Sequence, residues 1–186
     1  MRQKSYDNSP SLYLIPTPIG NMEDITLRSI NTLKMVDIIL CEDTRITGEL
    51  LSKLEIKKKL IHSDDHTEDG LKEMVLDKLK EGLNIGLVTD RGTPIISDPG
   101  YRIVEFVSKN GFNVISLPGP TAFVPALTAS GLNPQPFLFY GFLNSKASKR
   151  EKELESLKKL PYTIILYEAP HRIHDMLETL LKVFGD

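Results

Sequence analysis

The sequence has few of the features that mark secreted, metal-binding or membrane proteins. It contains one cysteine, Cys41, which excludes an internal disulfide and any motif of paired cysteines for zinc or redox chemistry. No apolar run approaches the length of a membrane span. The first residues, MRQKSYDNSP, lack the apolar centre of a signal peptide. These absences predict a cytoplasmic protein that does not associate with a membrane.

An excess of charge of one sign is also missing. The chain has 23 basic and 25 acidic residues, so its formal net charge is -2. This balance argues against a protein that wraps nucleic acid with a strongly basic surface. Local basic clusters occur at 57–59 and 146–159. Such clusters are more often solvated faces than contacts with an RNA backbone, and both alternatives remain open.

Three common nucleotide-binding and catalytic motifs are absent: GxGxxG, the phosphate loop GxxxxGK followed by Ser or Thr, and GxSxG. The segment HSDDH (62–66) brings two histidines and two aspartates together. Their order fits no common ligand spacing, so no metal site is predicted. Cys41 lies inside an apolar run, which predicts a small buried side chain.

Short apolar runs alternate with longer segments of helical period. The runs end in Gly, Pro, Asp or Ser, and several are continuously apolar, as strands buried on both faces tend to be. This alternation predicts an α/β fold with a mainly parallel sheet. The predicted strands are 12–16, 36–41, 59–62, 84–89, 113–117, 136–140 and 162–167.

The helical segments are recognised from their period and their end signals. Residues 24–35 place five apolar side chains, among them Leu27 and Met35, near one face. Asp98 precedes Pro99 and is expected to cap the helix that follows. The predicted helices are 24–35, 68–81, a segment that starts after Asp98–Pro99 and ends near Gly111, and 171–184.

The length of 186 residues suggests one large domain or two small lobes. Residues 1–10 are polar and are expected to form a flexible tail. The segment LPGPT marks the best boundary, because its prolines and glycine cannot continue a strand or helix smoothly. We therefore predict an N-terminal α/β lobe at 11–117 and a partial C-terminal α/β lobe at 118–186. Two strands are too few for a complete lobe, so this part is expected to stop short or to borrow a surface from a partner.

The ends of the predicted strands carry the most informative residues, because ligands of parallel sheets bind beyond the carboxyl ends of the strands. In PTPIGN (16–21), two prolines stiffen a turn and a glycine permits close approach, although an ordinary connection is equally expected. In CEDTR (41–45), Asp43 or Thr44 can cap a helix. Arg45 can bind a carboxylate or phosphate, or form a surface ion pair, and the capped helix with an ion pair is the simpler alternative.

Three further strand ends follow the same rule. TDRGTPIISDPG (89–100) concentrates Gly, Pro and Asp in one long connection, which indicates a ligand loop in which Asp90 can accept hydrogen bonds. PGPTA (118–122) opens a helix. In YEAPHR (167–172), a histidine and an arginine lie in a first helical turn, where cations oppose the helix dipole. This unfavourable placement indicates that the two side chains could have a functional role. The alternative is that they are exposed and form ion pairs with nearby acidic residues.

Together, the segments PTPIGNMEDIT, CEDTR, TDRGTPIISDPG, PGPTA and YEAPHR resemble the tetrapyrrole methylase superfamily. More narrowly, they are similar to its RNA-modifying branch, the ribosomal RNA small subunit methyltransferase I family. The match runs in order from about residue 11 to the end of the sequence. The resemblance implies a two-lobed class III methyltransferase-like fold, usually a homodimer, that holds S-adenosylmethionine in the cleft between its lobes.

The resemblance also implies a reaction and a set of site residues. The branch methylates the ribose 2′-hydroxyl of a cytidine in small-subunit ribosomal RNA, so the expected partner is this RNA or the assembled small ribosomal subunit. Arg91 stands where the branch usually has alanine, and its guanidinium could clash with the cofactor or point outward to RNA. The expected cofactor-binding residues are Pro16, Asp90, Gly92, Pro94, Ile95, Ile96, Thr121, Ala122, Tyr167 and Glu168, and the expected RNA-binding residues are Arg45, Arg91 and Arg172.

A ribose hydroxyl must lose its proton when it attacks a methyl group, and a carboxylate or imidazole can accept it. Glu42, Asp43 and His171 are the candidates, and the sequence does not rank them. Two other functions stay open. One is methylation of a precorrin-type tetrapyrrole, which the CEDTR and YEAPHR segments disfavour. The other is a non-catalytic ribosome-binding module, if the short C-terminal part is natural.

Overall fold

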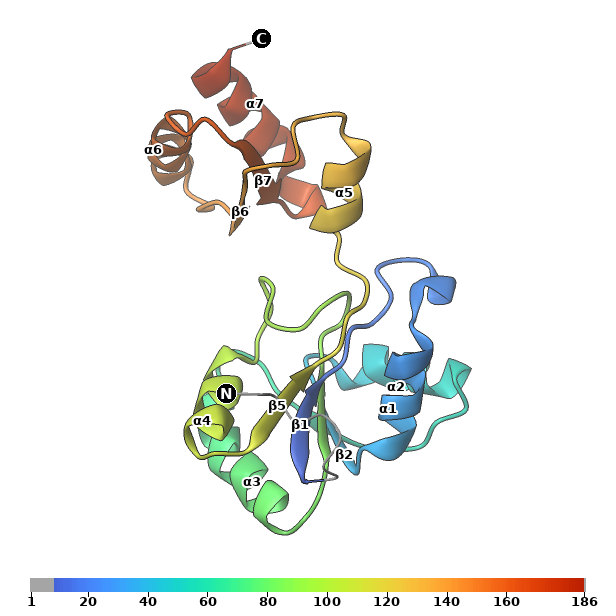
Figure 1. The fold of residues 1–186 in the computed structure, drawn as a ribbon. Helices are drawn as coiled ribbons and strands as arrows, with labels where there is room; N and C mark the ends of the chain where they lie inside the picture. The colour runs from blue at the N-terminus through green and yellow to red at the C-terminus, as the bar shows by residue number, and fades with distance from the viewer. Residues whose placement is uncertain (1–8, 186) are drawn as a thin grey trace. The chain divides into compact units, whose positions relative to one another are not determined.

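A computed structural model describes residues 9–185, so most of the tail predicted at 1–10 lies outside the described residues. The chain divides into two compact units, Met1–Thr121 and Ala122–Asp186 (Figure 1). Each unit has its own sheet, its own helices and its own core. We therefore describe each unit by itself.

The N-terminal unit is built on a five-stranded sheet in which every neighbouring pair is parallel. The strand order is β3-β2-β4-β1-β5. All four residues of β2 and of β4 are buried, as their continuous apolar character predicts. The sheet confirms the predicted α/β fold with a mainly parallel sheet. Its strands are β1 (Ser11–Leu14), β2 (Ile38–Cys41), β3 (Lys59–His62), β4 (Ile85–Val88) and β5 (Asn113–Ser116).

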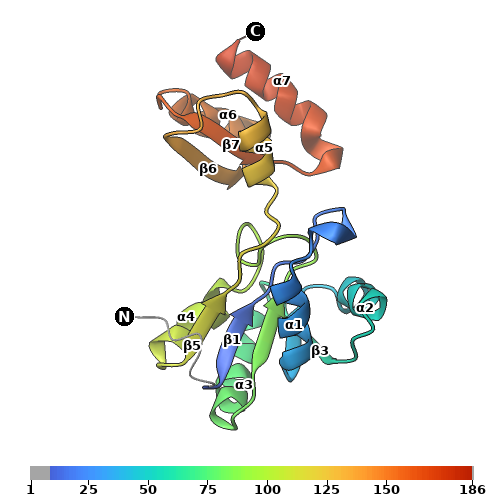
Figure 2. The same ribbon diagram turned by 45° about the vertical axis from the view of Figure 1, so that its right-hand side comes forward.

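Helices cover both faces of this sheet (Figure 2). On one face, Leu33 of α1 and Leu51 of α2 pack into a cluster that also contains Cys41. On the other face, Val75 of α3 and Ile103 of α4 pack against the sheet. The helical segments are η1 (Met22–Asp24), α1 (Leu27–Met35), α2 (Thr44–Lys53), α3 (Glu68–Lys80) and α4 (Tyr101–Lys109).

The helix predicted at 24–35 does not keep its apolar side chains on one face. The α-helix begins only at Leu27, because the Thr26 side chain caps it by accepting from the Ser29 backbone N–H at 2.9 Å. Ser29 and Leu33 are buried. Leu27 is 80% exposed and Met35 is 43% exposed.

The expected helix cap at Asp98 was also wrong. Helix α4 starts two residues later, with Gly100 at its cap position and no side-chain cap from that position. The carboxylate of Glu68, on α3, takes that place: it accepts hydrogen bonds from the backbone N–H groups of Gly100 and, at 3.0 Å, of Arg102. Glu68 is only 2% exposed, so this cap is buried.

The C-terminal unit pairs β6 with β7 in parallel, with an irregularity between Phe139 and Gly141. Leu154, Met176 and Val183 belong to its core. No helix among residues 9–185 is long and apolar enough to cross a membrane. The elements are α5 (Phe123–Ala129), β6 (Phe137–Phe142), α6 (Ala147–Leu157), β7 (Thr163–Tyr167), η2 (Pro170–Arg172) and α7 (Ile173–Phe184).

The basic segment 146–159 does not present all of its charges to solvent. Arg150 is 4% exposed, and its guanidinium donates to Thr179 Oγ1 at 3.0 Å and to the Asp175 carbonyl at 3.1 Å. It therefore joins α6 to α7 inside the unit. The remaining lysines of this segment keep both the solvated and the RNA-contact alternatives open.

Candidate functional site

The strand order of the N-terminal unit creates a topological switch point between β1 and β4. These two strands are neighbours. The connection after β1 leads toward β2 and one edge of the sheet, whereas the connection after β4 leads to β5 on the other edge. The two connections therefore leave the carboxyl ends of neighbouring strands in opposite directions, and doubly wound sheets bind their ligands where the direction of the connections changes. The loops are the predicted segments 16–21 and 89–100.

Hydrogen bonds join these two loops at their base. Thr17 and Gly92 form an isolated antiparallel bridge, with backbone N–H to carbonyl distances of 2.9 and 3.1 Å. The Thr17 hydroxyl also donates to the Thr89 carbonyl at 3.1 Å. Gly92 has a φ of +94°, a backbone conformation that favours glycine. The bridge thus holds the start of the 89–100 loop in a defined position.

The loop after β5 packs onto the same place. A Cβ atom on Gly119 would lie 2.5 Å from Pro16 Cβ, so only glycine allows this approach. The Thr93 hydroxyl donates to the Pro120 carbonyl at 2.9 Å and lies 2.5 Å from the Thr121 hydroxyl. The structure therefore gathers three predicted loops at one edge of the sheet.

The 89–100 loop also contains unusual backbone conformations. Ile95 and Ser97 have φ values of +76° and +65°, which are uncommon for residues other than glycine. Backbone strain of this kind clusters at ligand sites and is maintained by the surrounding structure. Here the loop is held at one end by the Gly92 bridge and at the other by Glu68 at Gly100. Pro94 is buried within it and Ile96 is 36% exposed.

Three carboxyl groups gather beside this loop. Asp90 Oδ1 accepts from the Asp43 backbone N–H at 3.0 Å, which ties the end of β4 to the end of β2. Glu42 Oε2 accepts from the Thr89 hydroxyl at 3.4 Å. Burial raises the pKa of Glu42, and the nearby charges of Asp90 and Asp98 raise it further. Burial likewise raises the pKa values of Asp90 and Asp98.

The pKa of Asp43 is lowered, whereas the pKa of Glu42 is raised. Its side chain caps α2 by accepting from the Arg45 backbone N–H at 2.8 Å, which confirms one of the expected caps. It also pairs with the Arg45 guanidinium at 2.6 Å, and these hydrogen bonds lower the pKa of Asp43 to about 2. The Arg45 side chain is 87% exposed. The structure thus contains the capped helix with a surface ion pair.

His62 at the end of β3 is a site residue that the sequence reasoning missed. Its Nδ1 lies 2.7 Å from the Glu42 carbonyl and its Nε2 lies 3.1 Å from Asp64 Oδ2. Both partners are acceptors, so both ring nitrogens donate when the ring is protonated, and these bonds raise the pKa of His62. The available signal was the position of HSDDH, which begins at the last residue of the strand predicted at 59–62.

The other predicted site residues lie in the C-terminal unit. The Tyr167 hydroxyl accepts from the Phe123 backbone N–H at 3.2 Å. Glu168 Oε1 accepts from Arg172 Nε at 2.7 Å, while Glu168 Oε2 is buried and has no hydrogen-bond partner among residues 9–185. His171 is exposed, and Ala122 begins this unit. A common site of these residues with Asp90 stays a prediction.

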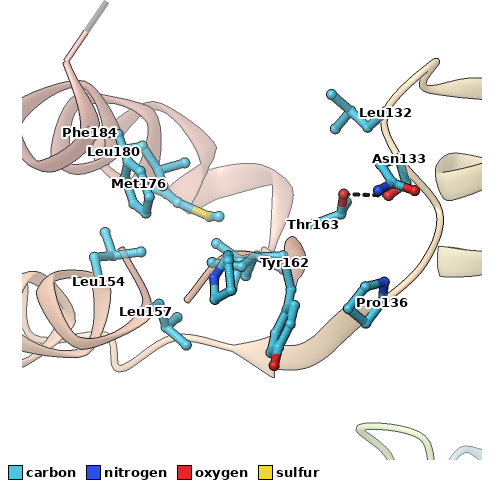
Figure 3. Close-up of a pocket in the computed structure, with 13 residues that line it drawn as sticks. Leu132, Asn133, Pro136, Leu154, Leu157, Tyr162, Thr163, Met176, Leu180 and Phe184 are labelled. Carbon is cyan, nitrogen blue, oxygen red and sulfur yellow. Dashed lines mark hydrogen bonds between the residues drawn. The ribbon is translucent and has the colours of Figure 1, made fainter. Parts of the chain in front are cut away.

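The C-terminal unit also has an apolar pocket of about 640 Å³ (Figure 3). Leucine, methionine and phenylalanine side chains from α6 and α7 point into it, including Leu154, Met176 and Phe184. The lining residues with polar side chains are Asn133, Tyr162 and Thr163, and the Thr163 hydroxyl already donates to the Asn133 carbonyl at 2.6 Å. No carboxylate, amine or imidazole is among the residues that line this pocket.

Comparison with known proteins gives a consistent result. The profile of the family described as tetrapyrrole (corrin/porphyrin) methylases matches residues 11–186. The chain is 48% identical to ribosomal RNA small subunit methyltransferase I of Bacillus subtilis (strain 168), over 100% of this chain and 64% of that protein. Proteins of the same name from Vibrio cholerae and Escherichia coli O157:H7 are 46% and 45% identical, over 96% and 100% of this chain and 62% and 65% of their own lengths. The chain thus spans less than two thirds of these relatives.

Solved structures share the fold. A cobalt precorrin-4 methyltransferase superimposes with a TM-score of 0.69 and 18% identity, covering 94% of this chain and 75% of that one. Uroporphyrin-III C-methyltransferase from Thermus thermophilus gives a TM-score of 0.63 and 20% identity, covering 92% and 73%. At these identities the likeness shows the fold alone, and it confirms the predicted class III methyltransferase fold.

Proposed function

Because the chain belongs to the tetrapyrrole (corrin/porphyrin) methylase family, we propose that it binds S-adenosylmethionine and methylates small-subunit ribosomal RNA. The finer proposal is transfer to the ribose 2′-hydroxyl of a cytidine. The observation that carries it is the convergence of three loops at the β1/β4 switch point, beside partly buried carboxylates. The names of the relatives supply the RNA substrate.

The residues at the switch point suit this cofactor. S-adenosylmethionine supplies an electrophilic methyl group on a positively charged sulfonium, next to an amino acid end and an adenosine. Glu42, Asp90 and Asp98 make this edge of the sheet electronegative, which favours a cation. The 92–96 loop and Thr121 present backbone and hydroxyl groups to a ligand. Gly119 lets the loop after β5 approach Pro16 closely. Tyr167 and Glu168 are proposed as further cofactor contacts.

Among the three candidate proton acceptors, Glu42 is the best placed. A general base near neutral pH needs a pKa above that of an ordinary carboxylate, and burial with neighbouring negative charge raises the pKa of Glu42. Asp43 is engaged by Arg45, and its pKa is lowered to about 2. We therefore assign proton acceptance to Glu42 and helix capping to Asp43. His171 is exposed and is kept for contact with RNA or a partner subunit.

Arginine side chains would hold the RNA. Arg45 and Arg91 are exposed close to the proposed site, and guanidinium groups bind phosphates in two-point contacts. Exposure of Arg91 favours its outward orientation over a clash with the cofactor. Arg172 is paired with Glu168, so its contact with RNA would require exchange of that ion pair. Assembly as a homodimer and a cytoplasmic location are part of the same proposal.

Calorimetric titration of the chain with S-adenosylmethionine tests the cofactor assignment. Asp90→Asn is the informative variant, because the amide oxygen can still accept from the Asp43 N–H while the negative charge is lost. We expect saturable binding that weakens in Asp90→Asn and is unchanged in Asp24→Asn, an exposed aspartate on η1. The absence of binding to the unmodified chain would contradict the proposal.

A methylation assay then tests the substrate. Small ribosomal subunits that lack the modification are incubated with the chain and labelled S-adenosylmethionine, and the RNA is digested to nucleosides. Label in 2′-O-methylcytidine is expected, and Glu42→Gln should lower the rate of transfer far more than it weakens cofactor binding. Label in a tetrapyrrole acceptor instead would favour the precorrin-type alternative. Tight subunit binding with no transfer would favour the non-catalytic module.

A further inference from the structure

A groove in the N-terminal unit lies beside the switch point, and most of its lining residues have no role in the proposed reaction. It has a volume of about 210 Å³ and is formed by the loop after β1, one side of α2 and the first residues after β4. Pockets for drug-sized ligands measure roughly 300 Å³ or more. The groove therefore admits a single flat ring and is too small for a tetrapyrrole macrocycle.

The lining combines apolar walls with separate charges. Met22 and Ile46 supply apolar surface, and Ile46 is 41% exposed although it lies on α2 beside the site. Glu49 and Asp90 supply two carboxylates, and Lys53 and Arg91 supply two cations. Asp90 accepts from the Asp43 backbone N–H, whereas within residues 9–185 the side chains of Glu49, Lys53 and Arg91 form no hydrogen bond or ion pair. Groups of both signs that stay unpaired around a hollow are available to a ligand that carries both a donor and an anion.

We propose that this groove holds the cytosine base of the nucleotide to be methylated, turned out of single-stranded RNA. The inference rests on the proposed function and names the part of the substrate that the N-terminal unit recognises. Met22 and Ile46 contact the faces of the base, the Glu49 carboxylate accepts from its exocyclic amine, and Lys53 and Arg91 bind the flanking phosphates. Enzymes that act on a nucleotide commonly hold it out of the stack between apolar side chains.

The carboxylate determines which base is accepted. Cytosine presents an amine donor at the position where uracil presents a carbonyl oxygen, so Glu49 attracts the first and repels the second. The groove is also continuous with the proposed cofactor loop, because Asp90 and Arg91 belong to both. A methyl acceptor must lie beside the methyl donor, and this shared boundary meets that requirement.

Binding of short RNAs to the full 186-residue chain tests the inference. The probes are a single-stranded oligouridine and the same oligomer with one central cytidine, measured by fluorescence anisotropy over a range of salt concentrations. We expect the cytidine probe to bind more tightly, by roughly fivefold or more. Glu49→Gln should remove this preference. Lys53→Ala should weaken the binding of both probes equally. It should also reduce the salt dependence of the binding constant by the amount that about one phosphate contact contributes.

Matched controls separate the groove from general charge effects. Lys34 occupies the last turn of α1 as Lys53 occupies the last turn of α2, and Glu73 is an exposed glutamate on α3. Lys34→Ala and Glu73→Gln should bind both probes like the unmodified chain. Equal binding of the two probes to the unmodified chain, or an unchanged preference in Glu49→Gln, overturns the groove assignment.

The outcome for the groove can be told apart from the outcome for the proposed function. If the chain binds S-adenosylmethionine and methylates RNA while Glu49→Gln and Lys53→Ala behave like the unmodified chain, the enzyme assignment stands and the groove assignment falls. If the chain neither binds the cofactor nor methylates RNA, the proposed function falls. Cytidine preference that persists without cofactor binding supports the groove alone.

Discussion

The buried carboxylate of Glu68 should be among the most important single groups for the shape of the proposed cofactor loop. It accepts hydrogen bonds from the Gly100 and Arg102 backbone N–H groups, where the loop ends and α4 begins. No side chain from the preceding loop caps α4. Replacing Glu68 with alanine therefore leaves two helix-terminal donors without their acceptor in a place that water reaches poorly.

The magnitude follows from these two bonds. Hydrogen bonds to a charged group contribute about 1.5 to 3 kcal/mol each, so Glu68→Ala should lower the free energy of unfolding by about 3 kcal/mol or more. Glu68→Gln keeps one carbonyl oxygen but turns an amide donor toward the second N–H, and should lower it by about 1 to 2 kcal/mol. Both variants should also weaken S-adenosylmethionine binding, because the 89–100 loop loses its second attachment.

Urea unfolding measures the change in stability, and hydrogen exchange of the α4 amides measures where it occurs. The two variants should lower the midpoint at an unchanged dependence on urea, and the first turn of α4 should exchange faster. Glu73→Ala on the exposed side of the same helix α3 is the control. If Glu68→Ala costs no more than Glu73→Ala, the reasoning about the buried cap is refuted.

Two further changes test contacts at the same edge of the sheet. Gly119→Ala places a Cβ atom 2.5 Å from Pro16 Cβ, so the loop after β5 must shift. We expect the free energy of unfolding to fall by about 1 to 3 kcal/mol and cofactor binding to weaken. Unchanged urea curves and unchanged calorimetric titrations would contradict this prediction. The pKa of His62 is raised by bonds to the Glu42 carbonyl and Asp64, so its stabilisation is present below about pH 6.5 and is lost as the pH rises through the raised pKa. His62→Gln should thus lower the urea midpoint at acidic pH and much less at alkaline pH, and an equal loss at both would exclude the charged contact.

Much of the N-terminal fold could be predicted because its central strands are buried on both faces. Strands in that position carry almost no polar side chains, so β2 (IILC) and β4 (IGLV) are visible as continuous runs without a polar side chain. The end of α4 near Gly111 was predictable for a similar local reason: that residue has a φ of +81°, which favours glycine. In both cases the residue type at a position indicates the burial or the backbone conformation of that same position.

One error occurred where a distant segment decides the local structure. Asp98 has the chemistry of a helix cap, yet α4 is capped by Glu68, which lies on another helix. A second error concerned helix α1, because Leu27 was placed near the same face as Leu33, but Leu27 is exposed and Leu33 is buried. At 3.6 residues per turn these two side chains lie about 120° apart around the helix, so they cannot both face the sheet.

By itself, the sequence determined the α/β class, the five motif segments that we propose to form the site, and the family to which the chain belongs. Local patterns and motifs specify these features, because each depends on residues that are neighbours in the chain. Only the tertiary structure decided that Asp90 holds Asp43 and that Gly119 meets Pro16. It also decided that the His62 ring forms a hydrogen bond with the Glu42 backbone carbonyl. These contacts join residues far apart in the chain, and the order of the parallel strands brings their carboxyl ends to one edge of the sheet.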